Sequence, residues 1–279
     1  MARPAAPGLN VRRWESGRWS DAPDAVVTEE PLQLMLGSTP LSVVMRTPGN
    51  DIELALGLLY AEGIARSLSD VESVRVSAES GEGDPRVRVD ASIVESNQVD
   101  VHLAHAPRRK PERSMLSSSA CGVCGVVLID DLRRDLAVLP PGPVIDPGML
   151  PALVERLRSG QGVFTRTGGL HAAGLFTTSG EAVCVREDVG RHNAVDKVVG
   201  RMLLDGRLPL SDSVLVVSGR AGYEIVQKAI SAGAPVVAAV GAPSSLAVAL
   251  AREFNQTLVG FLRGERFNVY SASERLSRS

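Results

Sequence analysis

The sequence predicts an α/β protein in which a domain with a mostly parallel sheet follows a smaller mixed α+β N-terminal unit. In the C-terminal half, apolar runs of strand length alternate with helical patterns, as expected for strands joined by crossover helices. In the N-terminal half, short apolar runs are interrupted by Pro and Gly, which favours short strands joined by tight turns. With 279 residues, 44% of them hydrophobic, the chain is long enough to bury a sizeable core.

The N-terminal part predicts an arm over residues 1–22 and a mixed α+β unit over residues 23–106. The arm combines Arg, Pro, Gly and two Trp without periodicity, so we expect it to be loosely held. Residues 24–47 contain apolar runs broken by Pro and Gly, which predict three short strands in an antiparallel meander. Two further strands are predicted at Val71–Val76 and Arg86–Ala91, on either side of a turn-rich segment.

One amphipathic helix is predicted between these strands. Asn50 is a favourable N-cap residue, and Gly63 is a typical helix terminator. Between them, Ile52, Leu56 and Leu59 recur at helical spacing. We therefore expect one helix to cover the sheet of the N-terminal unit.

The rest of the chain predicts a long loop and then the α/β domain. From His102 to Ser119 the periodicity gives way to a polar, basic stretch, so residues 107–125 are assigned to a functional cysteine loop. Residues 126–279 are assigned to the α/β cofactor-binding domain, with the boundary near Pro107 or Pro140. Its strands are predicted at Ala182–Val185, Val214–Val217, Val236–Val240 and Leu258–Leu262, and its helices at Asn193–Leu204, Tyr223–Ser231 and Ser244–Glu253.

Charge and hydropathy argue against several classes of partner. The 30 Lys and Arg residues nearly balance the 32 Asp and Glu residues, so no overall field attracts nucleic acid or an anionic membrane. The N-terminus has no apolar run typical of a signal peptide, and nowhere do about 18 uncharged apolar residues follow one another. We expect a cytoplasmic protein that binds neither nucleic acid nor membrane.

The segment Cys121-Gly122-Val123-Cys124-Gly125 is the most distinctive local feature. Flanking glycines let the backbone bend so that both thiols can face one reactant. Basic residues on the same loop can lower a cysteine pKa and favour the reactive thiolate, namely Arg108, Arg109, Lys110 and Arg113. Cys121 and Cys124 are therefore the candidate catalytic residues.

Two other interpretations of this pair remain open. Half of a structural zinc site would need a second pair of ligands, and the sequence contains no second CxxC and no spaced His pair. A thioredoxin-like redox pair would be expected at a strand-to-helix junction, whereas a Ser-rich loop precedes Cys121. The third cysteine, Cys184, lies in an apolar strand pattern and is expected to be buried and inert.

Further polar segments follow predicted strands and suggest a ligand site. Ser218, Gly219 and Arg220 lie between an apolar strand and a helix, where free backbone amides and a guanidinium can hold phosphate. The junction at Gly241 repeats this pattern, so two adjacent turns predict a nucleotide-sized cleft, although plain strand-to-helix turns fit nearly as well. His171 follows paired glycines and either faces this pocket or is a core histidine.

A basic segment near the C-terminus offers an aromatic face, two guanidinium groups and a carboxylate. It is either an ordinary hairpin turn or a guanine pocket, and it comprises Phe261, Leu262, Arg263, Gly264, Glu265 and Arg266. A second charged segment, Arg186–Asn193, is expected at a helix start. There Asp188 can cap the helix, and His192 can titrate or form a hydrogen bond.

Six segments in this order, CGVCG, TGGLHAAGLF, EDVGRHNAVDK, SGRAGYEIVQKA, GAPSSLAVALA and VGFLRGERFNVYS, together resemble the formate dehydrogenase accessory sulfurtransferase family, often called FdhD. The resemblance implies that a cysteine desulfurase donates persulfide sulfur, which passes to the bis-molybdopterin guanine dinucleotide form of the molybdenum cofactor for a client formate dehydrogenase. It implies Cys121 as the persulfide carrier, residues 261–266 as cofactor contacts and a homodimer as the assembly.

The resemblance also implies a cytidine-deaminase-like α/β/α core. The zinc signature of the deaminases is missing, because Ala172 and Ala173 follow His171 where an H-x-E motif would place Glu, so no intrinsic metal is expected. Two alternatives to sulfur transfer remain. One is a non-catalytic chaperone that binds the molybdenum cofactor for formate dehydrogenase, and the other is a zinc-dependent, deaminase-like hydrolase.

Overall fold

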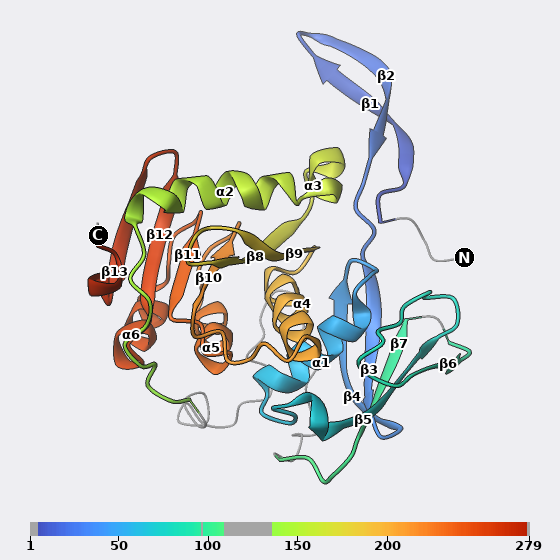
Figure 1. Ribbon diagram of the computed structural model, residues 1–279. Helices are drawn as coiled ribbons and strands as arrows, with labels where there is room; N and C mark the ends of the chain where they lie inside the picture. The colour runs from blue at the N-terminus through green and yellow to red at the C-terminus, as the bar shows by residue number, and fades with distance from the viewer. Residues whose placement is uncertain (1–4, 96, 109–135, 278–279) are drawn as a thin grey trace.

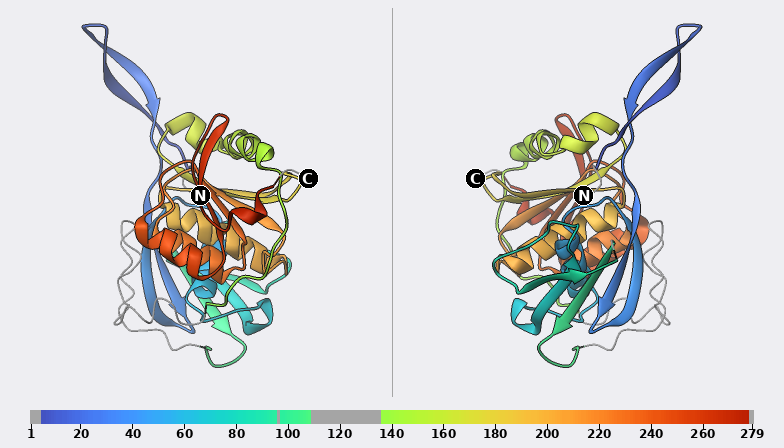
Figure 2. Two further views of the ribbon diagram at one scale, coloured as in Figure 1. Left: turned by 90° about the vertical axis from the view of Figure 1, so that its left-hand side faces the viewer. Right: turned by 90° about the vertical axis from the view of Figure 1, so that its right-hand side faces the viewer.

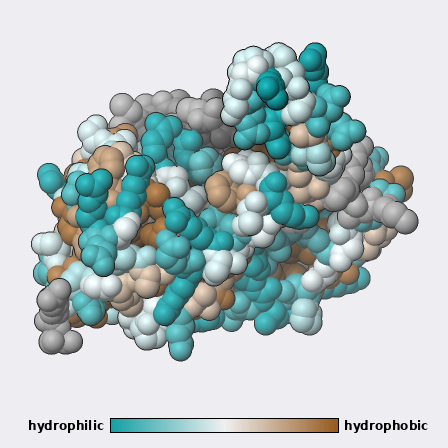
Figure 3. All heavy atoms as spheres, turned by 90° about the horizontal axis from the view of Figure 1, so that it is seen from above, coloured by the Kyte–Doolittle hydropathy of each residue, from teal (hydrophilic) through white to brown (hydrophobic). Residues whose placement is uncertain are grey.

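The computed structural model describes residues 5–95, 97–108 and 136–277, and its strands form three sheets (Figure 1). A two-stranded hairpin projects from the body, a five-stranded sheet belongs to the N-terminal unit, and a six-stranded sheet forms the core of the C-terminal domain. Cys121 and Cys124 lie outside the described residues. The face of the molecule that lies at the top in Figure 1 is mainly hydrophilic (Figure 3).

A projecting hairpin occupies most of residues 1–22, for which the sequence predicts an arm. Strands β1 (Gly8–Glu15) and β2 (Arg18–Ala25) pair antiparallel and extend away from the body (Figures 1 and 2). Trp14 lies opposite Trp19, with 5.2 Å between the ring centroids. The turn between them has positive φ at both central residues, the geometry that matches the twist of paired strands.

The five-stranded sheet has the order β4-β3-β7-β5-β6. Residues 24–47 contain two complete strands of it rather than three. Strand β7 was not predicted, although residues 98–103 alternate polar and apolar side chains as a strand does. Both sequence-predicted strands after the helix are present. The strands are β3 (Glu30–Leu36), β4 (Thr39–Arg46), β5 (Val71–Ser77), β6 (Val89–Ile93) and β7 (Gln98–Leu103).

The six-stranded sheet has the order β13-β12-β11-β10-β8-β9 and confirms the α/β class. The prediction of a mostly parallel sheet is wrong, because only the β10–β11 and β11–β12 pairs are parallel. Short turns join β8 to β9 and β12 to β13, and strands joined so tightly pair antiparallel. The strands are β8 (His171–Thr177), β9 (Ala182–Asp188), β10 (Ser213–Val217), β11 (Val236–Ala239), β12 (Thr257–Arg263) and β13 (Arg266–Ser271).

Helices cover both faces of this sheet, which gives an α/β/α core (Figure 1). In β10, Val214 and Val216 pack in the cluster that contains α2, whereas Leu215 and Val217 join the cluster of the opposite face. Helix α2 therefore covers one face, and α4, α5 and α6 cover the other. The helices are α2 (Leu150–Ser159), α3 (Gly162–Thr167), α4 (Arg191–Leu204), α5 (Tyr223–Ser231) and α6 (Ser245–Glu253).

Helix α1 (Asp51–Ala61) joins the two units by crossing α4 at very short range. A Cβ on Gly57 would lie 1.9 Å from the Asp196 carbonyl oxygen, and a Cβ on Gly200 would lie 1.8 Å from the Glu53 carbonyl oxygen. Only glycine fits at this crossing. One apolar cluster runs through the contact, so the predicted boundary separates two sheets but not two cores.

The start of α1 differs from the predicted cap. Asn50 occupies the N-cap position with φ 60° and makes no side-chain capping bond. The Glu82 carboxylate instead accepts hydrogen bonds from the amides of Asp51 (2.7 Å) and Ile52 (2.9 Å). A carboxylate from the turn-rich segment therefore satisfies the positive end of the helix. Among the helices of the described residues, none is long and apolar enough to cross a membrane.

Candidate functional site

Three segments that lie far apart in the sequence meet where β10, β11 and β12 end. These strands are mutually parallel, so the segments that follow them leave the sheet at the same edge. The Gly241 amide donates to the Gly219 carbonyl oxygen at 3.0 Å, and the Phe261 amide donates to the Gly241 carbonyl oxygen at 3.0 Å. The predicted phosphate turn and the predicted guanine segment are thus connected by hydrogen bonds through Gly241. We call this the C-terminal edge.

The close approach of the turns depends on glycine at position 241. A Cβ there would lie 2.9 Å from the Gly219 carbonyl oxygen and 3.0 Å from the Arg220 backbone nitrogen. Any larger residue would separate the two turns. The sequence identified both turns, but their direct contact follows only from the pairing of β10 with β11.

His171 is held beside the phosphate turn by its neighbour in the chain. The Ala172 amide donates to Ser218 Oγ at 2.9 Å, and the Ser218 amide donates to the Ala172 carbonyl oxygen at 2.9 Å. A Cβ on Gly219 would lie 3.3 Å from His171 Nδ1. His171 is half-buried at this edge rather than fully buried in a core, and its contact with a ligand remains a prediction.

The electrostatic environment of His171 is cationic. Burial lowers the pKa of His171, and the nearby Arg191, His192 and Arg220 lower it further. Asp188 lies opposite His171 in the pairing of β9 with β8. Its carboxylate forms a 2.7 Å ion pair with buried Lys197. The C-terminal edge therefore combines turn amides with an excess of positive charge, which suits a phosphate-bearing ligand.

The segment Phe261–Arg266 forms the β12–β13 hairpin, so the hairpin interpretation is correct and the guanine pocket remains a prediction. Phe261 has φ 54° at a register shift in β12, and its side chain is 42% exposed. Positive φ is unusual for a bulky residue and indicates a local constraint that reorients it. Arg263 Nε donates to the Val240 carbonyl oxygen at 3.3 Å, and Gly264 and Glu265 form the turn before Arg266.

One predicted contact residue in this hairpin does not face a ligand. The Leu262 side chain is fully buried among the apolar residues of the α2 face. In a regular strand, Val259 and Leu262 would point to opposite faces of the sheet. The register shift between Gly260 and Arg263 brings both side chains to the α2 face. The assignment of the Leu262 side chain to cofactor binding is therefore corrected to a role in the core.

The candidate catalytic thiols, Cys121 and Cys124, fall outside the described residues. Of the basic residues on their loop, Arg108 is described, and its guanidinium pairs with Asp70 at 3.2 Å. Cys184 is buried in β9, and burial raises the pKa of its thiol to about 11. The prediction of a buried Cys184 is confirmed, and this thiol has little thiolate character near neutral pH.

Arg191 and Glu224 lie beside the candidate site but were not selected from the sequence. Arg191 begins α4, and its Cβ lies 3.9 Å from the Cβ position of Gly219. Glu224, in the first turn of α5, pairs with His192 Nε2 at 2.9 Å. The charge density of the Arg186–Asn193 segment was a signal, but it did not reveal that α4 begins beside the turn after β10.

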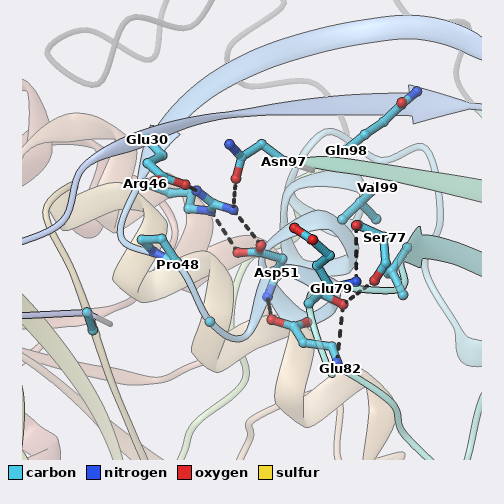
Figure 4. Close-up of a pocket in the computed structure, with 14 residues that line it drawn as sticks. Glu30, Arg46, Pro48, Asp51, Ser77, Glu79, Glu82, Asn97, Gln98 and Val99 are labelled. Atoms are coloured by element: carbon cyan, nitrogen blue, oxygen red, sulfur yellow. Dashed lines mark hydrogen bonds and ion pairs between the residues drawn. The ribbon is translucent and has the colours of Figure 1, made fainter. Parts of the chain in front are cut away.

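Two cavities are found among the described residues, and neither is lined by the turns of the C-terminal edge. The larger, about 270 Å³, belongs to the N-terminal unit and is lined mainly by bonded polar groups such as Arg46, Asp51 and Glu82 (Figure 4). The smaller, about 170 Å³, includes Thr47 and Lys197. No predicted site residue lines either cavity. Within the described residues, no group of three or more His, Cys, Asp or Glu side chains is arranged to hold a metal ion.

Known proteins resemble this chain over nearly its whole length. A model of the FdhD/NarQ family matches residues 27–277. A relative from Streptomyces coelicolor, named sulfur carrier protein FdhD, is 49% identical over 96% of this chain and 94% of its own length. A relative of the same name from Sulfolobus acidocaldarius is 41% identical over 96% of this chain and 97% of its own. The fold is shared with the crystal structure of a candidate formate dehydrogenase accessory protein from Desulfotalea psychrophila. The match has a TM-score of 0.77 and 23% identity, and it covers 98% of this chain and 100% of that one.

Proposed function

This chain belongs to the FdhD/NarQ family, and from that membership we propose that it is a sulfurtransferase that carries sulfur for the maturation of a formate dehydrogenase. The observation that carries the proposal is the 49% identity, over 96% of the chain, to a relative named as a sulfur carrier protein. The donor is a cysteine desulfurase, and the acceptor is the bis-molybdopterin guanine dinucleotide form of the molybdenum cofactor. The protein acts as a homodimer in the cytoplasm.

The sulfur is carried on Cys121. Its thiolate attacks the outer sulfur of the donor's persulfide, so a new S–S bond forms on Cys121 while the donor's cysteine leaves as a thiolate. In the second transfer, the acceptor supplies the electron pair to the outer sulfur, and Cys121 leaves as a thiolate. Cys124 relays the sulfur, or its thiolate attacks the inner sulfur of the Cys121 persulfide, which forms a Cys121–Cys124 disulfide and releases hydrosulfide.

The C-terminal edge binds the nucleotide part of the acceptor. Phosphates lie at Arg220 and the start of α5, where helix amides and a guanidinium favour anions. Guanine lies near exposed Phe261 and Arg263, whose aromatic face and donors suit a planar base. The support for this arrangement is the hydrogen-bonded connection from Gly219 through Gly241 to Phe261.

Intact-protein mass spectrometry tests the carrier role. The protein is incubated with a cysteine desulfurase and cysteine, and its mass is recorded before and after reductant. We expect a reductant-sensitive gain of one sulfur atom in the wild type and in Cys184→Ala, which removes the buried thiol, but not in Cys121→Ala. Full sulfur-transfer activity in Cys121→Ala would refute the assignment of the carrier. No gain in the wild type would favour the cofactor-binding chaperone.

Nucleotide affinity tests the binding site separately. Arg220→Ala and Arg263→Ala are each expected to weaken the binding of guanosine diphosphate by about tenfold or more, because each removes a charged donor. Arg252→Ala is the matched control, since Arg252 lies near the end of α6 and donates to the Tyr270 carbonyl oxygen. Unchanged affinity in both site variants would exclude this location for the nucleotide.

A further inference from the structure

The start of α4 adds a second group of cationic side chains to the C-terminal edge. A side chain at Gly219 would contact both the His171 ring, at 3.3 Å from Nδ1, and the Arg191 Cβ, at 3.9 Å. His171 and Arg191 thus flank the turn that precedes Arg220. The Ala172–Ser218 hydrogen bonds fix His171 in this position, and α4 fixes Arg191.

The carboxylates near this group are already engaged. Asp188 accepts hydrogen bonds from the Gly190 amide and Asn193 Nδ2, both at 2.8 Å, in addition to its ion pair with Lys197. Glu224 pairs with His192. The positive charge of Arg191 and Arg220 is consequently left without a compensating carboxylate among the described residues.

A buried donor of Arg191 points to a missing acceptor. Among the residues that the structure describes, Arg191 Nε is buried and has no hydrogen-bond partner. A buried charged donor without an acceptor is costly, so such groups commonly indicate an absent ligand or water. Helix α4 also begins here, and no side chain among the described residues caps its N-terminus.

We propose that His171 and Arg191 form a proton-linked second anchor for the diphosphate group of the nucleotide ligand, with His171 taking up a proton as the diphosphate binds. The identity of this ligand rests on the proposed function. The Arg191 guanidinium donates to one phosphate oxygen, and the protonated imidazole adds the second positive charge.

The proton linkage follows from the charges around His171. Without ligand, burial lowers the pKa of His171, and the nearby Arg191, His192 and Arg220 lower it further. Asp188 acts in the opposite direction. A diphosphate with two negative charges offsets the guanidinium groups of Arg191 and Arg220 and raises that pKa again. Binding therefore captures a proton, and the affinity must fall as the pH rises through the range in which His171 titrates.

Titration calorimetry with diguanosine diphosphate tests this proposal, because its bridging diphosphate does not ionise between about pH 6 and 8, where an ordinary histidine titrates. Runs in two buffers with different ionisation enthalpies count the protons taken up. We expect uptake in the wild type, no uptake in His171→Asn, and an affinity at least about tenfold weaker in Arg191→Gln than in Arg191→Lys. His105→Asn, at an exposed histidine of the N-terminal unit, should behave as the wild type.

The outcomes separate this inference from the proposed function. Binding without proton uptake, or uptake that persists in His171→Asn, would refute the linkage even if Cys121 loads with sulfur. Equal affinities for the two Arg191 variants and the wild type would refute the anchor. No binding of the dinucleotide to the wild type would also refute the inference, whereas a failure of sulfur loading alone would leave it standing. Thermal unfolding of each variant verifies that it is folded.

Discussion

The crossing of α1 and α4 gives the prediction that the geometry determines most directly. In Gly57→Ala, the new Cβ would start 1.9 Å from the Asp196 carbonyl oxygen, whereas real contacts of this kind exceed 3.0 Å, so the helices must separate by about 1 Å. Overpacking of this kind costs about 3 kcal/mol, while replacing a helical glycine with alanine returns about 1 kcal/mol. The expected net loss is therefore about 2 kcal/mol of unfolding free energy.

Thermal unfolding followed by circular dichroism measures this loss. For a chain of this size, about 2 kcal/mol corresponds to a Tm lower by about 4–8 °C. Gly162→Ala is the matched control, because it makes the same change in α3, where no heavy atom lies within 4 Å of the new Cβ. The control should unfold at the wild-type temperature or slightly above it. If Gly57→Ala were as stable as the wild type, the close packing of α1 on α4 would be refuted.

Three further predictions concern buried or paired ionisable groups. Cys184, whose thiol pKa is raised to about 11, should resist iodoacetamide at pH 8 in the folded protein and react fully in denaturant, as read by mass spectrometry. Lys197→Met should lower the unfolding free energy by about 3–5 kcal/mol in urea titrations, because it leaves the buried Asp188 charge unpaired. A smaller loss in the double variant Lys197→Met, Asp188→Asn would show that the unpaired charge is the reason. The Arg201 guanidinium lowers the pKa of Asp205 in the folded protein. The pair therefore stabilises the fold above the pKa of an unfolded Asp, about 4, and this stabilisation is lost as the pH falls through the lower pKa of the folded state. Asp205→Asn should therefore reduce the decline in stability between about pH 5 and 3, and an unchanged acid profile would contradict this pairing.

Local patterns in the sequence determined most of the C-terminal elements. Helix α5 was predicted with the bounds that the structure has, and α4, α6, β10, β11 and β12 within a few residues. These elements were predictable because each is a continuous apolar or amphipathic run that ends at Gly, Asn or Ser. The CxxC pair and the turn at Ser218–Arg220 were equally visible, since residue type and order alone define them.

Other features depended on long-range contacts. The antiparallel pairing of β8 with β10 joins strands that are distant in the chain, and β7 lies between β3 and β5, with which it pairs. These pairings involve residues remote in sequence, so a local pattern does not encode them. The hairpin of β1 and β2 is local, but its cross-strand pairs do not produce an apolar periodicity.

The candidate site shows the same division between sequence and tertiary structure. The sequence by itself determined the fold class, the family resemblance, and the thiol, His171 and turn residues that carry the proposed chemistry. Only the tertiary structure brought Arg191 beside Gly219, joined Gly219 to Phe261 through Gly241, and turned Leu262 into the core. The physical reason is that residue chemistry is local, whereas proximity and burial arise from strand order and from helices packed against the sheet.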